Sequence, residues 1–246
     1  MTYCVALKLS AGLVMLSDTR TSAGVDNVSR FRKMFTWEVP GERAICLMTA
    51  GNLSITQGVI TRIGAEIKKS EAGDEVETLL NAPSMFRIAQ IVGNYMREMQ
   101  GHHRETLIEQ GAGADATILV SGQRAGGGHR LFMVYSAGNF IEAADDTPYF
   151  QAGEHKYGKP ILDRVITPET TLRRALKAAF VSMDSTLRSN LSVGMPLDLA
   201  MIRANELKFA IKRRIEADDE EFTQISHMWS DALREAFRSL PEIGED

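Results

Sequence analysis

The chain has 246 residues, of which 28 are basic and 32 are acidic, and its formal net charge is −4. Hydrophobic residues make up 44% of the sequence and charged residues 24%, proportions that exclude a wholly disordered chain. No segment clusters lysines and arginines with interleaved aromatic residues, and together with the mild acidity this argues against a nucleic-acid-binding protein.

The apolar runs are too short for a membrane protein. The longest, 44–50 and 194–202, are far below the roughly 20 residues that cross a bilayer. No basic segment precedes the first apolar stretch, which Lys8 interrupts, so no secretory signal is predicted. Cys4 and Cys46 lie in apolar runs and are expected to be buried free thiols of a cytoplasmic protein. No motif indicates a metal or another cofactor.

Blocks of predicted strands and blocks of predicted helices follow one another along the chain, as judged from the spacing of apolar residues. In chain order, the predicted elements are strands Tyr3–Leu9, 13–16, 31–37 and 44–49, helices 54–69 and 84–105, strands 116–121, 130–135 and 140–144, a helix 168–187 with Thr167 as its N-cap, strands 196–203 and 207–211, and a helix 218–238. Turn points are predicted at Gly24 and Asn27, in the polar stretch after the second strand.

This order predicts an α+β fold. Strands that come in hairpins and helices that come in blocks fit two antiparallel sheets packed face to face, with helices on the outer faces. The glycines Gly126, Gly127 and Gly128 predict a hairpin turn, because a strand follows them and a phosphate-binding loop requires a helix there. No repeat or boundary is visible, so residues 1–246 are expected to form a single domain.

The second residue, Thr2, is a candidate nucleophile. If Met1 is removed, Thr2 carries a β-hydroxyl and a free α-amine, whose ordinary pKa of about 7.7–8.0 suits a base near neutral pH. One residue then supplies both the nucleophile and its base. Many proteins begin with Met-Thr for no catalytic reason, so this position alone does not indicate catalysis.

Three later residues could assist such a threonine. A lysine such as Lys33 disfavours protonation of a neighbouring amine, and an aspartate such as Asp18 would hold the lysine ammonium in place. Gly51 ends a predicted strand just before a helix, where a backbone N–H can stabilise an oxyanion. Taken singly, each also has an ordinary explanation as a cap, a solvated charge or a turn.

In combination, these features resemble the proteasome β-subunit family of N-terminal nucleophile (Ntn) hydrolases. The resemblance rests on Thr2, the run SDTR around Asp18, Lys33, and the run MTAG that ends at Gly51. The segment 2–57 is most similar to the Anbu group of bacterial proteasome homologues, the ancestral β subunits. Weaker similarity in VYSAGNFIEA, YFQAGEHKYGKPILDR and SVGMPLDLAMI extends over most of the chain.

The resemblance implies a four-layer αββα sandwich of the Ntn hydrolase type and peptide hydrolysis through an acyl ester on Thr2. It implies that Asp18 and Lys33 form the charge pair that tunes Thr2, that Arg20 braces the Asp18 loop, and that the Gly51 N–H is the oxyanion donor. By the same resemblance, the residues near the substrate side-chain pocket are Thr21, Phe31, Thr49 and Leu53.

The sequence departs from the family pattern at two supporting positions. Active proteasome subunits have a Gly-Ser pair where this chain has Gly153 and Glu154. They also have an aspartate and a serine after the third helix. Ser192 matches that serine, but only Ser189 or the uncharged Asn190 is available for the aspartate. These departures argue against full proteasome-like activity and leave Thr2, Asp18 and Lys33 intact.

The family works as rings or ring-like stacks, so the resemblance implies a homo-oligomer. Peptides or unfolded proteins are its expected substrates, and an ATPase partner is not evident. The predicted helix 218–238 fits either a contact between subunits or packing on the chain's own sheet. Two alternatives stay open: an Ntn amidohydrolase for a specialised small peptide or amide, and a weakly active or non-catalytic ring scaffold.

Overall fold

The computed structural model describes residues 2–22 and 28–244; Met1 and the predicted turn points at Gly24 and Asn27 lie outside the described residues. The strands are β1 (Tyr3–Leu9), β2 (Gly12–Asp18), β3 (Arg20–Ser22), β4 (Val28–Arg30), β5 (Met34–Val39), β6 (Arg43–Gly51), β7 (Ala116–Arg124), β8 (Arg130–Val134), β9 (Phe140–Glu142), β10 (Tyr149–Gly153), β11 (Leu197–Arg203) and β12 (Phe209–Ile215). The helices are α1 (Leu53–Glu71), α2 (Met85–Glu109), α3 (Lys159–Val165), α4 (Leu172–Ser189) and α5 (Glu220–Arg238). No helix in the described ranges is long and apolar enough to span a bilayer.

The first sheet is built around the N-terminal hairpin. Its strand order is β10-β1-β2-β11-β12, and every neighbouring pair is antiparallel. The hairpin register sets Cys4 opposite Ser17, which brings Tyr3 to the level of Asp18. All of β2 is buried, and so is β1 except at Lys8, because both faces of this sheet are covered. The start of the chain is therefore an interior strand.

The second sheet has the order β5-β6-β7-β8-β9 and is also antiparallel throughout. β6 is buried along its length except at its last residue, Gly51. A separate two-strand hairpin, β3–β4, pairs Thr21 with Ser29 beside the first sheet's β2 end.

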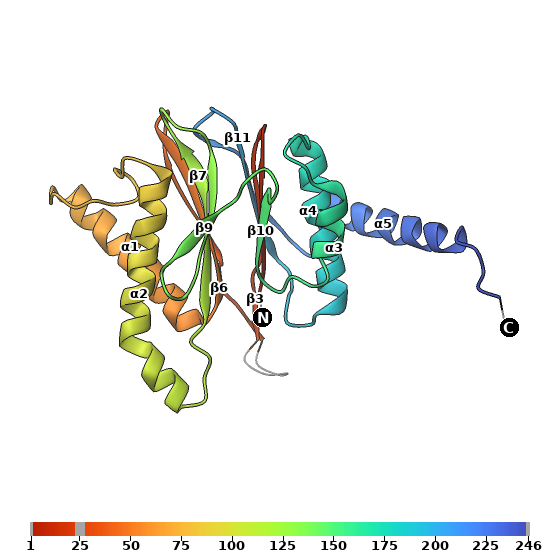
Figure 1. Ribbon diagram of the computed structural model, residues 1–246, viewed down its shortest axis with the longest axis horizontal. Helices are drawn as coiled ribbons and strands as arrows, with labels where there is room; N and C mark the ends of the chain where they lie inside the picture. Colours follow the sequence, from red (N-terminus) through yellow and green to blue (C-terminus); the bar gives the residue numbers. More distant parts are fainter. Residues whose placement is uncertain (1, 23–27, 245–246) are drawn as a thin grey trace.

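Three apolar layers hold the sheets and helices together. Between the sheets lie small and flexible side chains, among them Cys4, Met15, Cys46 and Met48. A second apolar cluster joins the outer face of the first sheet to α3 and α4, and a third joins the second sheet to α1 and α2. Figure 1 shows the resulting order of helices, sheet, sheet and helices. The predicted α+β class with antiparallel sheets is confirmed.

The segment 145–171 differs most from the prediction. It contains β10 and α3, neither of which was predicted. α4 begins at Leu172, because the Thr171 hydroxyl accepts a hydrogen bond from the Arg174 N–H and caps the helix. The predicted N-cap, Thr167, lies instead in a preceding turn, where its carbonyl accepts the Thr170 N–H.

Two strands, β5 and β12, begin at least two residues later than predicted. β5 begins at Met34 and not at residue 31, because the Phe31 N–H bonds back to the Thr19 carbonyl and leaves the segment 31–33 outside the sheet. β12 begins at Phe209, because Asn205 and Leu207 have φ angles of 67° and 52°, which no strand residue adopts.

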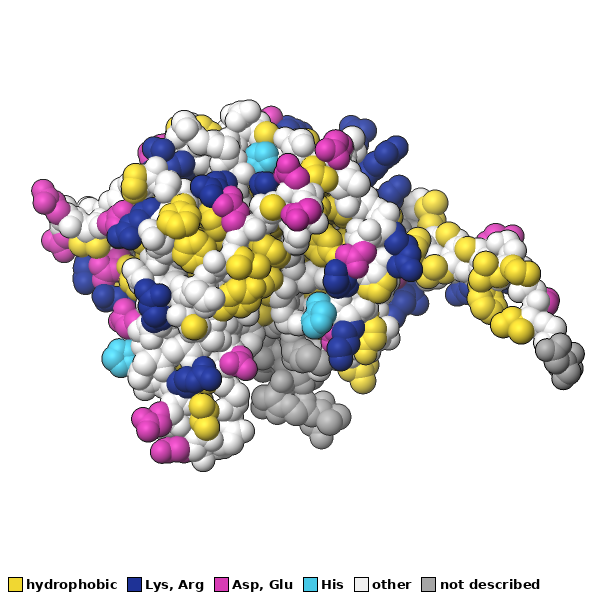
Figure 2. All heavy atoms as spheres, in the orientation of Figure 1, with side chains coloured by type: hydrophobic (Ala, Val, Ile, Leu, Met, Phe, Trp, Pro, Cys, Tyr) yellow, Lys and Arg dark blue, Asp and Glu magenta, His cyan; other side chains and the backbone are white. Residues whose placement is uncertain are grey.

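The last helix, α5, projects away from the layered body (Figure 1). Asp219 caps it by accepting the Phe222 N–H, and Phe222 and Ser226 are its buried residues. Further along, Met228 is 63% exposed and Phe237 77% exposed. Figure 2 shows apolar side chains gathered on this projecting part of the chain. In the single chain, the outer part of the apolar stripe therefore faces solvent.

Candidate active site

The site begins at the first described residue. Thr2 immediately precedes β1 and is only 8% exposed. Its carbonyl oxygen accepts a hydrogen bond of 2.6 Å from the Glu154 N–H, which continues the β1–β10 pairing by one step. The next residue, Tyr3, donates its N–H to Asp18 Oδ1 at 3.0 Å. The peptide unit that joins Thr2 to Tyr3 is thus held by two hydrogen bonds, one on each side of β1.

Asp18 occupies the last position of β2 and is completely buried. Besides the Tyr3 N–H, Oδ1 accepts the Lys33 ammonium at 2.7 Å, and Oδ2 accepts the Gly194 N–H at 3.2 Å. Burial raises the pKa of the Asp18 carboxyl, and the Lys33 charge and the three donors counteract part of that rise. This carboxylate therefore joins the N-terminal strand, the lysine and the loop that precedes β11.

Lys33 lies just before β5 and is 3% exposed. Its ammonium also donates to the Arg20 carbonyl, so a charge and a carbonyl dipole both hold it. The Lys33 carbonyl accepts the Thr49 N–H at 2.9 Å, and the Thr49 carbonyl lies 3.7 Å from Cys4 Sγ. These contacts place the lysine where β2, β3 and β6 approach the start of β1.

Arg20 lies in β3, and its side chain reaches the loop after α4. Its Nη1 donates to the Leu191 carbonyl at 3.0 Å. A Cβ atom on Gly194 would lie 2.1 Å from Arg20 Nε, so glycine leaves the room that the guanidinium fills. Arg20 and Gly194 thereby hold together the two loops that meet at Asp18.

The two positions that depart from the family pattern contact each other. Asn190, which ends α4, donates its Nδ2 to Glu154 Oε2 at 2.8 Å. The Asn190 Oδ1 accepts the Ser192 N–H at 3.0 Å. Glu154 Oε1 accepts the N–H groups of His155 and Lys156, both at 2.9 Å.

Glu154 is only 7% exposed, and Asn190 is 9% exposed. Burial opposes ionisation of Glu154, but the N–H of Lys156, the Asn190 amide and the N–H of His155 outweigh it and hold the pKa of this carboxyl below its usual value. A second anion therefore lies one residue from the Gly153–Thr2 contact.

Gly51 ends β6 opposite Ala116 and has a φ of +95°. A Cβ atom there would lie 2.2 Å from the Asp115 carbonyl, so this close approach of two backbones requires glycine. The residue follows Thr49 by two positions and is exposed, at the same end of β6 as Lys33.

The four predicted substrate-pocket residues lie on three elements and in the loop after β4. Thr21 belongs to β3, and Phe31, 36% exposed, follows the β3–β4 hairpin. Thr49 is buried in β6 beside Lys33, and Leu53 is the first residue of α1 and is partly exposed. Hydrogen bonds connect Phe31 to Thr19 and Thr49 to Lys33.

Sequence reasoning placed Thr2, Asp18, Lys33 and Arg20 in one site, and the structure brings these residues together. It missed Gly153 and Gly194, and it treated Glu154 as a departure only. A Cβ on Gly153 would lie 2.1 Å from the Thr2 carbonyl, a contact between residues 151 positions apart that no local pattern indicates.

The chain is similar to known proteins of solved structure over its whole length. No family model and no curated protein matches it. Among solved structures, the Gly-1 mutant of Anbu from Hyphomicrobium sp. strain MC1 is 47% identical, with 100% of each chain covered and a TM-score of 0.91. The chain belongs to the Anbu family. Anbu (ancestral beta-subunit) from Yersinia bercovieri is 41% identical, with 99% of each chain covered and a TM-score of 0.91.

A third Anbu structure bears on assembly. The structure described as the helical assembly of the Anbu complex from Pseudomonas aeruginosa is 43% identical, covers 99% of this chain and 98% of its own, and has a TM-score of 0.91. Membership of the Anbu family makes this chain a relative of proteasome β subunits, which confirms the resemblance found in the sequence.

Proposed function

We propose that the protein is a threonine-type Ntn hydrolase, a proteasome-like peptidase that works inside a self-assembled particle in the cytoplasm. The observation that carries the proposal is the buried Lys33–Asp18 pair joined by a hydrogen bond to the residue after Thr2. A buried lysine–aspartate pair contributes little net stability in general, so its place beside a candidate nucleophile favours a chemical role.

The proposed reaction starts once Met1 has been removed. The Thr2 hydroxyl attacks the carbonyl carbon of a peptide bond, and its proton passes to the α-amine of Thr2. The carbon–nitrogen bond then breaks, the leaving amine takes that proton, and an ester remains on Thr2. Water attacks the ester, gives a proton to the α-amine, and releases the acid as Thr2 recovers its hydroxyl proton.

The remaining residues receive roles that follow from their positions. The Lys33 ammonium favours the neutral α-amine and the ionised hydroxyl, and Asp18 holds that ammonium. The Gly51 N–H is the proposed oxyanion donor, and Arg20, Asn190 and Ser192 support the loops around Asp18. Thr21, Phe31, Thr49 and Leu53 are proposed to line the substrate pocket.

Intact-mass spectrometry with a peptide epoxyketone tests this mechanism, because that electrophile reacts with both the hydroxyl and the amine of an N-terminal threonine. We expect a mass without Met1 and a single adduct, which Thr2→Ala abolishes and Lys33→Ala slows by at least about 100-fold, the scale of a lost acid–base group. Cleavage of a fluorogenic peptide library then reports the substrate class. A protein that lacks Met1 and never forms the adduct contradicts the proposal and favours the scaffold.

An adduct without peptide cleavage favours the specialised amidohydrolase instead. That alternative keeps the threonine chemistry and changes the substrate, and the uncharged Asn190 at the position of an expected aspartate is the observation that supports it.

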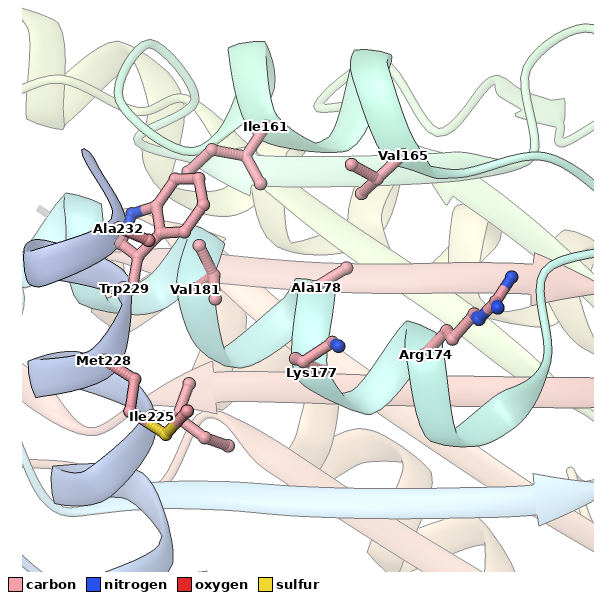
Figure 3. A pocket seen from close by; sticks show the side chains of 10 residues that line it. All are labelled: Ile161, Val165, Arg174, Lys177, Ala178, Val181, Ile225, Met228, Trp229 and Ala232. Atoms are coloured by element: carbon pink, nitrogen blue, oxygen red, sulfur yellow. The ribbon is translucent and has the colours of Figure 1, made fainter. Parts of the chain in front are cut away.

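We also propose that α5 forms contacts between subunits in the particle. An apolar groove of about 530 Å³ lies between α3, α4 and α5, where Ile161, Val181 and Trp229 line it (Figure 3). Arg174 and Lys177 add positive charge to the same groove. The indole Nε1 of Trp229 is buried without a hydrogen-bond partner among the described residues.

The proposed occupant of this groove is the C-terminal segment of a second copy, from Phe237 at the end of α5 onward. That segment exposes Phe237, Leu240 and Ile243, at 77%, 61% and 95%, and the sequence around it is acidic at Glu242, Glu245 and Asp246. Its apolar residues match the groove, and its acidic residues match the two groove cations. The assembled mass of the protein should therefore depend on this segment.

A further inference from the structure

We propose that Glu154 and Asn190 act together as the positioning pair of the Thr2 centre, with the supporting negative charge moved from position 190 to position 154. The inference rests on the threonine-hydrolase proposal above. It concerns two residues whose individual identities depart from the family pattern and whose side chains are hydrogen-bonded to each other.

Hydrogen bonds and short chain segments close a ring around the start of β1. The Tyr3 N–H bonds to Asp18, and Asp18 accepts the Gly194 N–H. Two residues back along that loop, the Ser192 N–H bonds to the Asn190 amide. The other end of that amide bonds to Glu154, whose own N–H bonds to the Thr2 carbonyl. Glu154 and Asn190 are the side chains that close this ring.

The hydrogen bonds determine which atoms of Glu154 and Asn190 face each other. Both Glu154 oxygens are used, one by two backbone N–H groups and the other by the Asn190 Nδ2. The Asn190 Oδ1 must accept the Ser192 N–H, so its Nδ2 must face Glu154. The pair therefore works with one carboxylate and one amide.

This complementarity accounts for both departures as one coupled change. An aspartate at position 190 would put two carboxylates at about the 2.8 Å that now separates Asn190 Nδ2 from Glu154 Oε2, and one of them would have to bind a proton. With Glu154 in place, an uncharged amide is the residue that fits position 190. The anion expected after α4 is thus present, but on the facing loop after β10.

An isosteric charge swap tests the pair. Glu154→Gln and Asn190→Asp each break one bond of the ring, whereas the double variant keeps every bond. In it, the new amide at 154 still accepts two N–H groups and donates to the new carboxylate at 190, which still accepts the Ser192 N–H. The matched control is Glu169→Gln, at an exposed glutamate between α3 and α4.

The measured quantity is the second-order rate constant for epoxyketone labelling of Thr2, at a temperature where thermal unfolding curves show every variant folded. We expect each single substitution to slow labelling at least about tenfold. In the double variant, labelling should be at least about tenfold faster than the product of the two single losses predicts, as for contacting polar residues. The control should label at the wild-type rate.

The outcomes separate this inference from the function it rests on. If the wild type is labelled and the two effects simply multiply, or if the variants shift the unfolding temperature without changing the labelling rate, the pair is structural and the inference is wrong. If the wild type without Met1 is not labelled at all, the threonine-hydrolase proposal fails, and the positioning role fails with it.

Discussion

The Lys33 ammonium lies 2.7 Å from the Asp18 carboxylate, and the two side chains are only 4% and 0% exposed. An ion pair so fully removed from water depends on both partners, because the loss of either leaves an uncompensated buried charge. Asp18 also accepts two backbone N–H groups, whereas Lys33 relies on Asp18 and one carbonyl. The loss of Lys33 should therefore lower the free energy of unfolding more than the loss of an exposed lysine does.

Lys33→Met should destabilise the folded protein by about 3–5 kcal/mol at pH 8, the cost of breaking a buried pair. The loss should be smaller at pH 5. Without Lys33, burial raises the pKa of the Asp18 carboxyl in the folded protein further above the unfolded value of about 3.9. The loss of stability therefore grows as pH rises from the unfolded pKa through the folded one. Urea denaturation at both pH values measures it. Lys68→Met, at an exposed lysine of α1, is the control, and an equal loss at pH 5 and pH 8 would contradict this account.

Gly153→Ala should disrupt the site more than a comparable change elsewhere. Gly153 has a φ of +84°, and an added Cβ would lie 2.1 Å from the Thr2 carbonyl oxygen. Gly41 has a φ of +72° with nothing within 4 Å, so Gly41→Ala carries backbone strain alone, about 1 kcal/mol. Urea denaturation should show at least twice that loss for Gly153→Ala, and threonine labelling should be lost in that variant alone. If Gly153→Ala and Gly41→Ala had equal effects on stability and on labelling, Thr2 would tolerate displacement.

His129 should make the fold sensitive to mild acid. Its Nε2 lies 2.6 Å from the Leu9 carbonyl, and burial lowers the pKa of this imidazole. Because the unfolded chain then binds a proton more readily than the folded chain, stability falls as pH drops below about 6.5. His129→Gln should reduce the difference between unfolding temperatures at pH 8 and pH 5.5. His227→Gln on α5 serves as the comparison, and an unchanged pH response in His129→Gln would refute the assignment.

Phe237→Lys should prevent or weaken assembly without unfolding the subunit. The side chain is 77% exposed in the single chain, so the substitution costs the isolated fold little. In the assembly it would bury an unpaired ammonium in an apolar groove that already carries Arg174 and Lys177. Sedimentation velocity over a concentration series should show a smaller particle for the variant. Ile108→Lys, at an exposed apolar residue of α2, is the matched control for added charge. A variant that assembles like the wild type would exclude this segment from the interface.

Elements with a strong apolar pattern could be predicted from the sequence. α1 and α2 follow stripes of buried residues such as Ile63 and Ile88, and the central strands are rich in apolar residues because both faces of their sheets are covered. β10 is not predicted because its alternation consists of only two buried residues, Phe150 and Ala152. The start of α4 was misplaced because Thr167 and Thr171 are both good N-cap residues, and only the hydrogen bonds distinguish them.

The site could be predicted only where the family pattern has residues of the right type. Thr2, Asp18 and Lys33 were found in this way, and each is close to the others in the chain. The link between Glu154 and Asn190 joins a loop after β10 to the end of α4, 36 positions apart. Each residue separately departs from the pattern, so their complementarity became visible only in three dimensions.

The ring around the start of β1 also has a consequence for biosynthesis. Thr2 is synthesised well before Gly194, the most distant of the groups around it, and β2 gains its second neighbour only when β11 (Leu197–Arg203) has formed. A nascent chain therefore carries Thr2 long before it carries the complete set of groups that surround Thr2 in the folded protein. Under the proposed mechanism, the order of the residues along the chain keeps the unfinished polypeptide inert, and Thr2 gains its reactivity only as the last third of the molecule folds onto it.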